Sequence, residues 1–288
     1  MIENIGEIPG RNFADLTFGD GGHTDMILEL MAHSIVGVDR DEETLKEYLR
    51  SGKFREDPRL QLIHAPFSEF ATQDSTERFD GILLDLGVST RQLLSPDRGF
   101  SFSGENALDM RMDRSANSPT ALEALKKASI NDIVEQLEFA DVKKPHKVAR
   151  EIKDRLQAGR LNTTADLAEI GGGGSRARHP STQLFMGIRL LVNQEFSEIS
   201  LAVPALIDKL TPNGRLLVIT FHSSEDRLIK RILASLSGKC VCDSPVCQCP
   251  KIERARPLFD KPLTPSRAEQ RSNPRSRSAK LRGVMRVD

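Results

Sequence analysis

The chain has 288 residues, of which 38% are hydrophobic, and its 41 Lys and Arg residues balance 41 Asp and Glu residues for a formal net charge of zero. This length and apolar content suffice for one large α/β domain, or for a core that carries an inserted subdomain. No apolar run approaches the roughly 20 residues that span a bilayer, and the first residues lack a secretion-signal pattern. We therefore expect a cytoplasmic protein with no membrane partner.

The first predicted strand comprises residues 13–18. Its apolar residues alternate as they do in a strand that buries one face. A tight turn follows, because three glycines stand close together and let the backbone bend and approach a ligand. They are Gly19, Gly21 and Gly22. A helix is predicted next, over residues 25–32, so this segment reads strand, glycine turn, helix.

A second strand is predicted over residues 34–39 and ends in Asp39. A carboxylate at that place can accept both hydroxyls of a ribose. The glycine order, Gly-Asp-Gly-Gly-His, does not spell the Gly-x-Gly-x-x-Gly pattern that cradles a pyrophosphate. We therefore expect a cofactor without phosphate, and S-adenosylmethionine fits. The alternative is a glycine-rich loop that binds nothing.

Further strands are predicted where apolar residues run almost without interruption, as in central parallel strands covered on both faces. They are residues 60–64, 81–86, 215–221 and 280–287. Helical periodicity dominates residues 40–53 and 181–210.

The interval between Leu86 and Arg215 is too long for one crossover helix, so we expect an insertion there. Helix signals cluster between residues 119 and 170. The predicted domains are residues 1–108 for the first part of the core, 109–180 for an inserted helical substrate-recognition subdomain, and 181–288 for the second part of the core with a basic C-terminal segment. Residues 171–175, Gly-Gly-Gly-Gly-Ser, have the composition of a flexible linker, natural or engineered.

The charge is unevenly spread, since residues 251–288 carry eleven Lys and Arg against four Asp and Glu. Many of these basic residues stand among Ser and Pro, a composition suited to binding the phosphate backbone of a nucleic acid. They include Arg267, Arg271, Arg275, Arg277, Lys280, Arg282 and Arg286. The segment is either a nucleic-acid contact or a solvated surface.

The four cysteines of the chain form one Cys-x-Cys-x4-Cys-x-Cys cluster. They are Cys240, Cys242, Cys247 and Cys249. In a cytoplasmic protein, close thiols indicate structural zinc more often than disulfides. The common spacing is Cys-x2-Cys, however, and a single intervening residue strains a shared tetrahedron. We therefore assign no metal ligand, and favour reduced cysteines in a surface loop over a zinc site.

Several further motifs together carry a resemblance. They are residues 83–89 (LLDLGVS), 98–102 (RGFSF), 108–113 (LDMRMD), 179–183 (HPSTQ), 189–195 (RLLVNQE), 221–227 (FHSSEDR) and 273–278 (NPRSRS). From about residue 15 to residue 282 the chain resembles the bacterial 16S ribosomal RNA cytosine-N4 methyltransferases, the MraW family. The resemblance implies a class I S-adenosylmethionine-dependent methyltransferase, with a Rossmann-like α/β sheet and an inserted α-helical subdomain. It also implies 16S rRNA within the small ribosomal subunit as partner, and a role in rRNA processing and ribosome biogenesis.

Carried over by motif, the resemblance implies cofactor contacts for a set of residues after the first, second, third and fourth strands. They are Gly21, Gly22, His23, Asp39, Phe67, Asp85 and Gln92. In these roles Phe67 would lie against the adenine face and Asp39 would hold the ribose. His23 stands beside the glycine turn, where we expect its side chain to line the cofactor site and to form a hydrogen bond there.

The exocyclic amine of cytosine is a weak nucleophile, because its lone pair is delocalised into the ring. A site for this reaction must accept the amine hydrogens and align the nitrogen with the sulfonium methyl group. We expect Asp85, or a carboxylate of the Asp109/Asp113 loop, to accept an amine hydrogen, and Arg111 to hold the base or a phosphate. Alternatively, residues 109–113 form a salt-bridged loop that only orders the insertion.

A cytosine in folded RNA must leave its stack to reach such a site. Arg176, Arg178 and Arg189 are further candidates for RNA backbone contacts, and residues 222–224 either line the site or cap a helix. Competing functions are a methyltransferase of this fold acting on another nucleobase or on protein, a nicotinamide-dependent oxidoreductase, and a noncatalytic RNA-binding scaffold. The sequence leaves the oligomeric state open, with a homodimer as one option.

Overall fold

The structure is a computed structural model that describes residues 2–102, 104–172, 180–242, 244, 246–247, 249 and 251–287. It divides into two compact units. The first comprises residues 1–87 and 196–288, and the second comprises residues 88–195.

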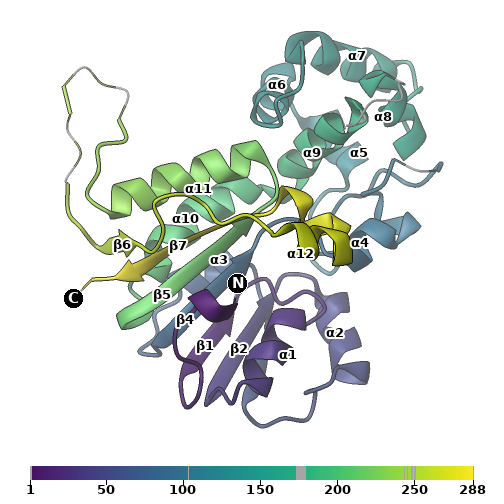
Figure 1. Cartoon of the computed structure of the whole chain (residues 1–288). Coiled ribbons are helices and arrows are strands. Elements are labelled where there is room, and N and C mark those ends of the chain that lie inside the picture. The colour runs from purple at the N-terminus through teal and green to yellow at the C-terminus, as the bar shows by residue number, and fades with distance from the viewer. Residues whose placement is uncertain are drawn as a thin grey trace. The chain divides into compact units, whose positions relative to one another are not determined.

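The first unit contains a seven-stranded sheet in the order β3-β2-β1-β4-β5-β7-β6 (Figure 1). The strands are β1 (Asn12–Asp15), β2 (Ser34–Asp39), β3 (Leu60–His64), β4 (Phe79–Asp85), β5 (Leu210–Thr220), β6 (Ala255–Pro257) and β7 (Lys280–Arg286). Strands β1 to β5 pair in parallel, whereas β7 runs antiparallel to both β5 and β6. The carboxyl ends of β1, β2 and β4 therefore meet at one edge of the sheet, which is where open α/β sheets bind ligands.

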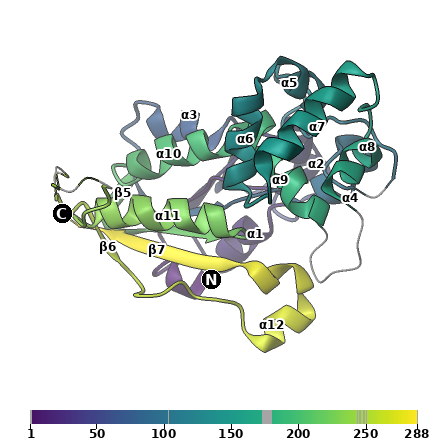
Figure 2. The ribbon, with the colours of Figure 1, turned by 90° about the horizontal axis from the view of Figure 1, so that it is seen from above.

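Helices cover both faces of this sheet, as Figures 1 and 2 show. They are α1 (Gly22–Glu29), α2 (Glu42–Ser51), α3 (Phe67–Thr72), α10 (Glu195–Leu206), α11 (Ser223–Leu236) and α12 (Arg267–Ser272), with 3-10 turns at Ile2–Asn4 and Pro274–Ser278. Side chains alternate between the two faces of a strand. Thus Val36 packs in the cluster that includes α10 and α11, while its neighbour Ile35 packs on the other face with residues of α1.

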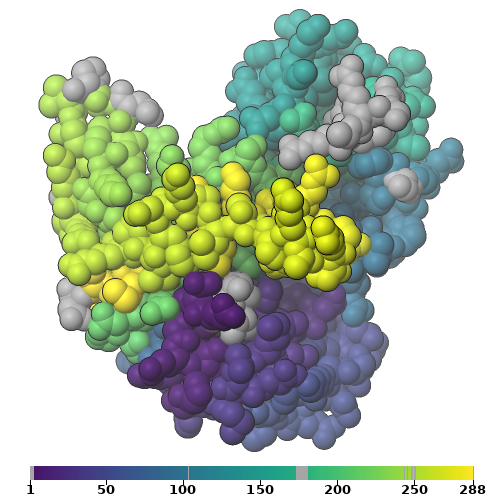
Figure 3. Space-filling view, viewed as in Figure 1, coloured from purple at the N-terminus to yellow at the C-terminus, as the bar shows by residue number. Residues whose placement is uncertain are grey.

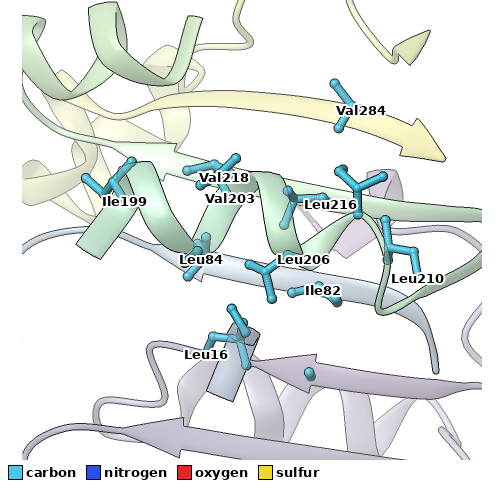
Figure 4. Close-up of a cluster of buried hydrophobic side chains, with 14 of the residues drawn as sticks. Leu16, Ile82, Leu84, Ile199, Val203, Leu206, Leu210, Leu216, Val218 and Val284 are labelled. Atoms are coloured by element: carbon cyan, nitrogen blue, oxygen red, sulfur yellow. The ribbon is translucent and has the colours of Figure 1, made fainter. Parts of the chain in front are cut away.

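The largest apolar cluster of this unit lies between the sheet and α10 (Figure 4). In it Val203 and Leu206 of α10 lie among strand residues such as Leu84 and Val218, all fully buried. Burying each such side chain contributes about 1.5–3 kcal/mol. The near-continuous apolarity of β4 and β5 in the sequence thus reflects burial on both faces.

Most predicted elements are present, with shifts at their ends. The predicted bounds of β2 and β3 match the structure, whereas β1 ends at Asp15 and not at residue 18. The predicted helical region 181–210 forms two helices, because Gln194 adopts a left-handed conformation with φ of 51° and interrupts it.

The second unit is helical, which confirms the predicted inserted α-helical subdomain. Its helices are α4 (Thr90–Leu94), α5 (Ala121–Lys127), α6 (Ile130–Phe139), α7 (Pro145–Gln157), α8 (Thr164–Gly171) and α9 (Pro180–Asn193), with a 3-10 turn at Pro96–Arg98. Four of them begin with a Ser or Thr cap whose side chain accepts the backbone N–H three residues on. Among the described helices of both units, none combines the length and the apolarity needed to cross a bilayer.

The bounds of the second unit differ from the predicted boundaries at 108/109 and 180/181. Its buried core includes Leu108 from before the first predicted boundary and Ile188 from beyond the second. Asn193, at the end of α9, donates from Nδ2 to the Met110 carbonyl at 2.8 Å and accepts the Met112 N–H at 2.8 Å. The loop around residue 110 and the whole of α9 therefore belong to one packed unit.

Candidate active site

The glycine turn after β1 has the left-handed backbone that glycine permits. Gly19 and Gly21 have φ of 53° and 79°. A Cβ atom at Gly21 would lie 2.4 Å from Cε2 of Tyr48, so a larger residue does not fit. At Gly22, the first residue of α1, a Cβ atom would meet no described atom within 4 Å. The turn is thus packed on the Gly21 side and open on the Gly22 side.

Asp39 ends β2 and ties that strand to the glycine turn. Its Oδ2 accepts the Gly19 N–H at 2.7 Å, and its Oδ1 accepts the Asp41 N–H at 2.8 Å. Burial raises the pKa of Asp39 to about 6, although both backbone hydrogen bonds act to lower it. At neutral pH the group is ionised, and each oxygen retains a lone pair for a further donor such as a ribose hydroxyl.

Asp85 is the last residue of β4, and its two carboxylate oxygens have different surroundings. Its Oδ2 lies 3.4 Å from Nε2 of His23, on α1. Its Oδ1 is buried and has no hydrogen-bond partner in the part of the chain that the structure describes. Because a buried carboxylate oxygen without a donor is costly, this oxygen indicates a place where a ligand donates a hydrogen.

His23 interacts with two carboxylates of the same unit, through a hydrogen bond with Asp85 and through the charge of Asp15. Burial lowers the pKa of His23, but the hydrogen bond with Asp85 and the charges of Asp15 and Asp85 outweigh burial and raise this pKa above its ordinary value. The imidazole is therefore protonated more readily than an isolated histidine.

Asp15 is a residue of this site that we did not single out from the sequence. It ends β1, is fully buried, and accepts the Thr24 hydroxyl at 2.9 Å. Burial raises the pKa of Asp15, while the charge of His23 acts to lower it. The available signal was a carboxylate at the end of an apolar strand, directly before the glycine turn.

Phe67 and Gln92 lie in different units. Phe67 is the first residue of α3, just past the end of β3, and is half-buried against the main apolar cluster. Gln92 is buried in the second unit, where its Oε1 accepts the Ser89 N–H at 3.0 Å and its Nε2 donates to the Met112 carbonyl at 3.4 Å. The cofactor roles of both residues stay predictions.

Asp109 and Arg111 also lie in the second unit, where they pair with each other. Oδ1 of Asp109 accepts the backbone N–H and Nε of Arg111, at 3.2 and 2.7 Å. Its Oδ2 accepts Nη2 of Arg111 and Nε of Arg114, both at 3.1 Å. Burial alone would raise the pKa of Asp109, but the two arginines hold it below its ordinary value. Four hydrogen bonds fill the acceptor sites of this carboxylate, which favours the salt-bridged loop over a proton acceptor.

The basic C-terminal segment divides into two groups. Lys280 and Arg282 on β7 both pair with Asp226, at 2.9 and 2.7 Å, and Arg286 donates to backbone carbonyls. These three residues fasten β7 to the first unit. Four other arginines are exposed on α12 and the 3-10 turn that follows it, at the surface shown in yellow in Figure 3. They are Arg267, Arg271, Arg275 and Arg277.

Three other predicted RNA contacts have different outcomes. Arg189 is buried and pairs with Glu195 at 2.7 Å, so it has no surface on which to meet RNA, and that prediction is wrong. Arg176 and Arg178 lie outside the described residues.

His222 directly precedes α11, and its N–H donates to Glu225 at 3.1 Å. Residues 222–224 therefore form the capped start of a helix.

A sheet of this strand order, with an antiparallel β7, a glycine turn after β1 and acids ending β2 and β4, defines a class I S-adenosylmethionine-dependent methyltransferase. The residues fit this donor, because the half-buried Asp39 carboxylate retains acceptor sites and the Gly22 side of the turn is open. The family model described as the MraW methylase family matches residues 1–287, and the chain belongs to that family.

Curated relatives align with nearly the whole chain. Ribosomal RNA small subunit methyltransferase H of Caldicellulosiruptor saccharolyticus is 37% identical, over 97% of this chain and 94% of its own length. The proteins of the same name from Rubrobacter xylanophilus and Magnetococcus marinus are 39% and 38% identical, over 96% of this chain and 90% and 93% of theirs. The similarity thus includes both units, and the resemblance seen in the sequence motifs is confirmed.

Proposed function

We propose that this protein transfers a methyl group from S-adenosylmethionine to the N4 amine of a cytosine in 16S ribosomal RNA of the small ribosomal subunit, in the cytoplasm. The name of the relatives described above, ribosomal RNA small subunit methyltransferase H, supports the RNA substrate and the small subunit. The observation that carries the choice of an amine is the buried Oδ1 of Asp85, which has no hydrogen-bond partner among the described residues. An amine hydrogen is the kind of donor that this oxygen lacks.

Residues of the first unit hold the donor in this proposal. Asp39 accepts the two ribose hydroxyls, Phe67 lies against the adenine, and the backbone at Gly21 and Gly22 contacts the amino-acid end. The donor, when bound, supplies an electrophilic methyl group on a sulfonium. Asp39 is well suited to this role because its two backbone hydrogen bonds fix the carboxylate before any ligand arrives.

Asp85 acts on the acceptor nitrogen. By accepting an amine hydrogen at Oδ1, it draws electron density to the nitrogen and turns the lone pair out of conjugation with the ring. It then takes the proton that the methylated nitrogen releases. His23 holds the other oxygen, Oδ2, and keeps the carboxylate oriented. His23 is a positioning residue in this scheme.

In this proposal the second unit contributes an ordered loop, and the first unit contributes contacts to the RNA. We assign Asp109 and Arg111 to the ordering of the 109–113 loop, since each is engaged by the other. The exposed arginines of α12 and the following turn are proposed to contact the RNA backbone from the first unit. A cytosine must be exposed or flipped out of its stack before its amine can reach the Asp85 carboxylate.

The test is to incubate the protein with labelled S-adenosylmethionine and ribosomes, and to measure the label in small-subunit RNA, large-subunit RNA and ribosomal protein separately. The proposal predicts label in small-subunit RNA alone. Label in protein or in large-subunit RNA would identify a different acceptor. Donor binding without any label transfer would point to a noncatalytic scaffold.

A further inference from the structure

The four cysteines occupy the loop between α11 and β6, which extends from the body of the first unit (Figure 1). The base of this loop is closed by the pairing of Ser237 with Glu253 and by a hydrogen bond from the Arg254 N–H to the Leu236 carbonyl at 2.8 Å. Cys240 and Cys242 stand on the outgoing arm, while Cys247 and Cys249 stand on the returning arm. The closed base brings the two Cys-x-Cys pairs to face each other.

The four sulfur atoms surround a space of the size of one ion. All four Sγ atoms lie within 4.8 Å of one another, and those of Cys240 and Cys242 are 3.3 Å apart. The cysteines form no disulfide. Tetrahedral zinc with Zn–S bonds of about 2.3 Å places its ligands about 3.8 Å apart. A cluster of several iron ions holds its thiolates farther apart than a single ion does.

Hydrophobic burial does not explain this convergence. Among the described residues from 237 to 254, none is buried, and Val246 and Ile252 are 71% and 63% exposed. A loop with no core has little apolar burial to offset the conformational entropy lost when it is ordered. If ionised, four thiolates at these distances would repel one another unless a cation lay between them. Small loops of this kind take their folding energy from a bound metal.

We propose that Cys240, Cys242, Cys247 and Cys249 bind one zinc ion as four thiolates. The one-residue spacing argued against zinc in the sequence, but each Cys-x-Cys pair needs to span only one edge of a tetrahedron when the two arms face each other. Four protein ligands leave no open coordination position, so the ion has a structural role in the loop.

The experiment uses the full chain, purified under reducing conditions without chelator. Zinc is measured by mass spectrometry of the protein sample, and about one ion per chain is expected. Replacing zinc by Co²⁺ is expected to give the sulfur-to-cobalt charge-transfer band and the intense visible bands of a tetrahedral thiolate site. The double variant Cys240→Ser/Cys242→Ser is expected to lose the metal and these bands, whereas Ser244→Ala, in the same loop, keeps both.

Binding of S-adenosylmethionine serves as the check on folding, since the loop contributes no residue to the donor site. The double variant is expected to bind the donor within about twofold of the unaltered protein, and to be cleaved by protease in the loop more readily. The proposal is overturned if the reduced protein carries no zinc and shows no cobalt bands, if it carries iron instead, or if the double variant retains its zinc.

Discussion

Nε2 of His23 lies 3.4 Å from Oδ2 of Asp85, so the first helix of the sheet unit holds one oxygen of the carboxylate that ends β4. The other oxygen of Asp85 stays buried without a described partner. This asymmetry leaves one oxygen for orientation and the other for a substrate hydrogen.

Replacing Asp85 by Asn keeps the size of the side chain but removes its charge and basicity. We expect the rate of methyl transfer at saturating donor and RNA to fall by about 100-fold or more, the range for loss of a general base. The dissociation constant of S-adenosylmethionine should change little. Asp74→Asn, at an exposed position of the same unit, is the control and should keep the full rate. A near-native rate for Asp85→Asn would remove this residue from the chemistry.

Donor binding should weaken in acid because of Asp39. The pKa of this carboxyl is raised to about 6 by burial, and only its ionised form offers all its acceptor sites to ribose hydroxyls. As the pH falls through 6 the group takes up a proton, so the dissociation constant for S-adenosylmethionine rises, approaching about tenfold per pH unit well below that value. Calorimetry between pH 5 and pH 8, set by that pKa, measures this. Asp39→Asn should bind about tenfold more weakly at neutral pH and lose the pH dependence.

The glycine turn offers a matched pair of substitutions. Gly21→Ala adds a Cβ atom 2.4 Å from Tyr48 at a left-handed position, so the melting temperature should fall by several degrees. Gly22→Ala meets no described atom and has an ordinary helical position, so it should melt close to the unaltered protein. Differential scanning calorimetry decides this. Equal melting temperatures would mean that the turn tolerates a side chain at Gly21.

Asp109→Ala tests the ordering role of the 109–113 loop. Without the carboxylate, Arg111 and Arg114 lose their shared partner in a largely buried setting. The free energy of unfolding should fall by about 3 kcal/mol, as for a broken buried ion pair. Denaturant titration measures the loss, with exposed Glu105→Gln as the control. A stable variant that binds RNA normally but transfers no methyl group would instead restore Asp109 as a catalytic residue.

The exposed arginines of α12 and the turn after it should set the salt dependence of RNA binding. A triple change to Gln removes Arg267, Arg271 and Arg277. We expect weaker binding to small subunits, and a slope of log K against log salt that is smaller by roughly 2. The matched control removes three exposed charges around α2, namely Lys46, Arg50 and Lys53. Equal slopes for the two variants would show that α12 does not meet the phosphates.

The sequence predicts this fold well where a pattern is local. Alternating or continuous apolar residues locate β2 and β3 to the residue, and the glycine turn with its flanking acids indicates the donor site. Partners that are distant in the chain are not encoded in such patterns. Two examples are the buried ion pair of Arg189 with Glu195 and the hydrogen bond from Asn193 to the Met110 carbonyl. Both depend on packing within the second unit, which residue spacing in the sequence does not reveal.

The same reason explains the cysteines and the domain boundaries. The Cys-x-Cys spacing alone does not show that a closed loop base brings two pairs together. Residues 88–108 read as a continuation of the sheet core, yet Leu108 is buried with the helices of the second unit. Asp15 was overlooked because a single acid in a strand has no period, although its hydrogen bond with Thr24 places it beside His23.

Identification of the methylated nucleoside bears most directly on the proposed reaction. Small ribosomal subunits lacking this modification are incubated with the protein and a donor whose methyl group carries deuterium, and the digested RNA is separated and weighed by mass spectrometry. We predict that the heavy methyl group appears on N4 of cytidine. A heavy methyl group on a carbon of cytosine, on another base or on protein, or its absence from a sample that binds the donor, would contradict the proposal.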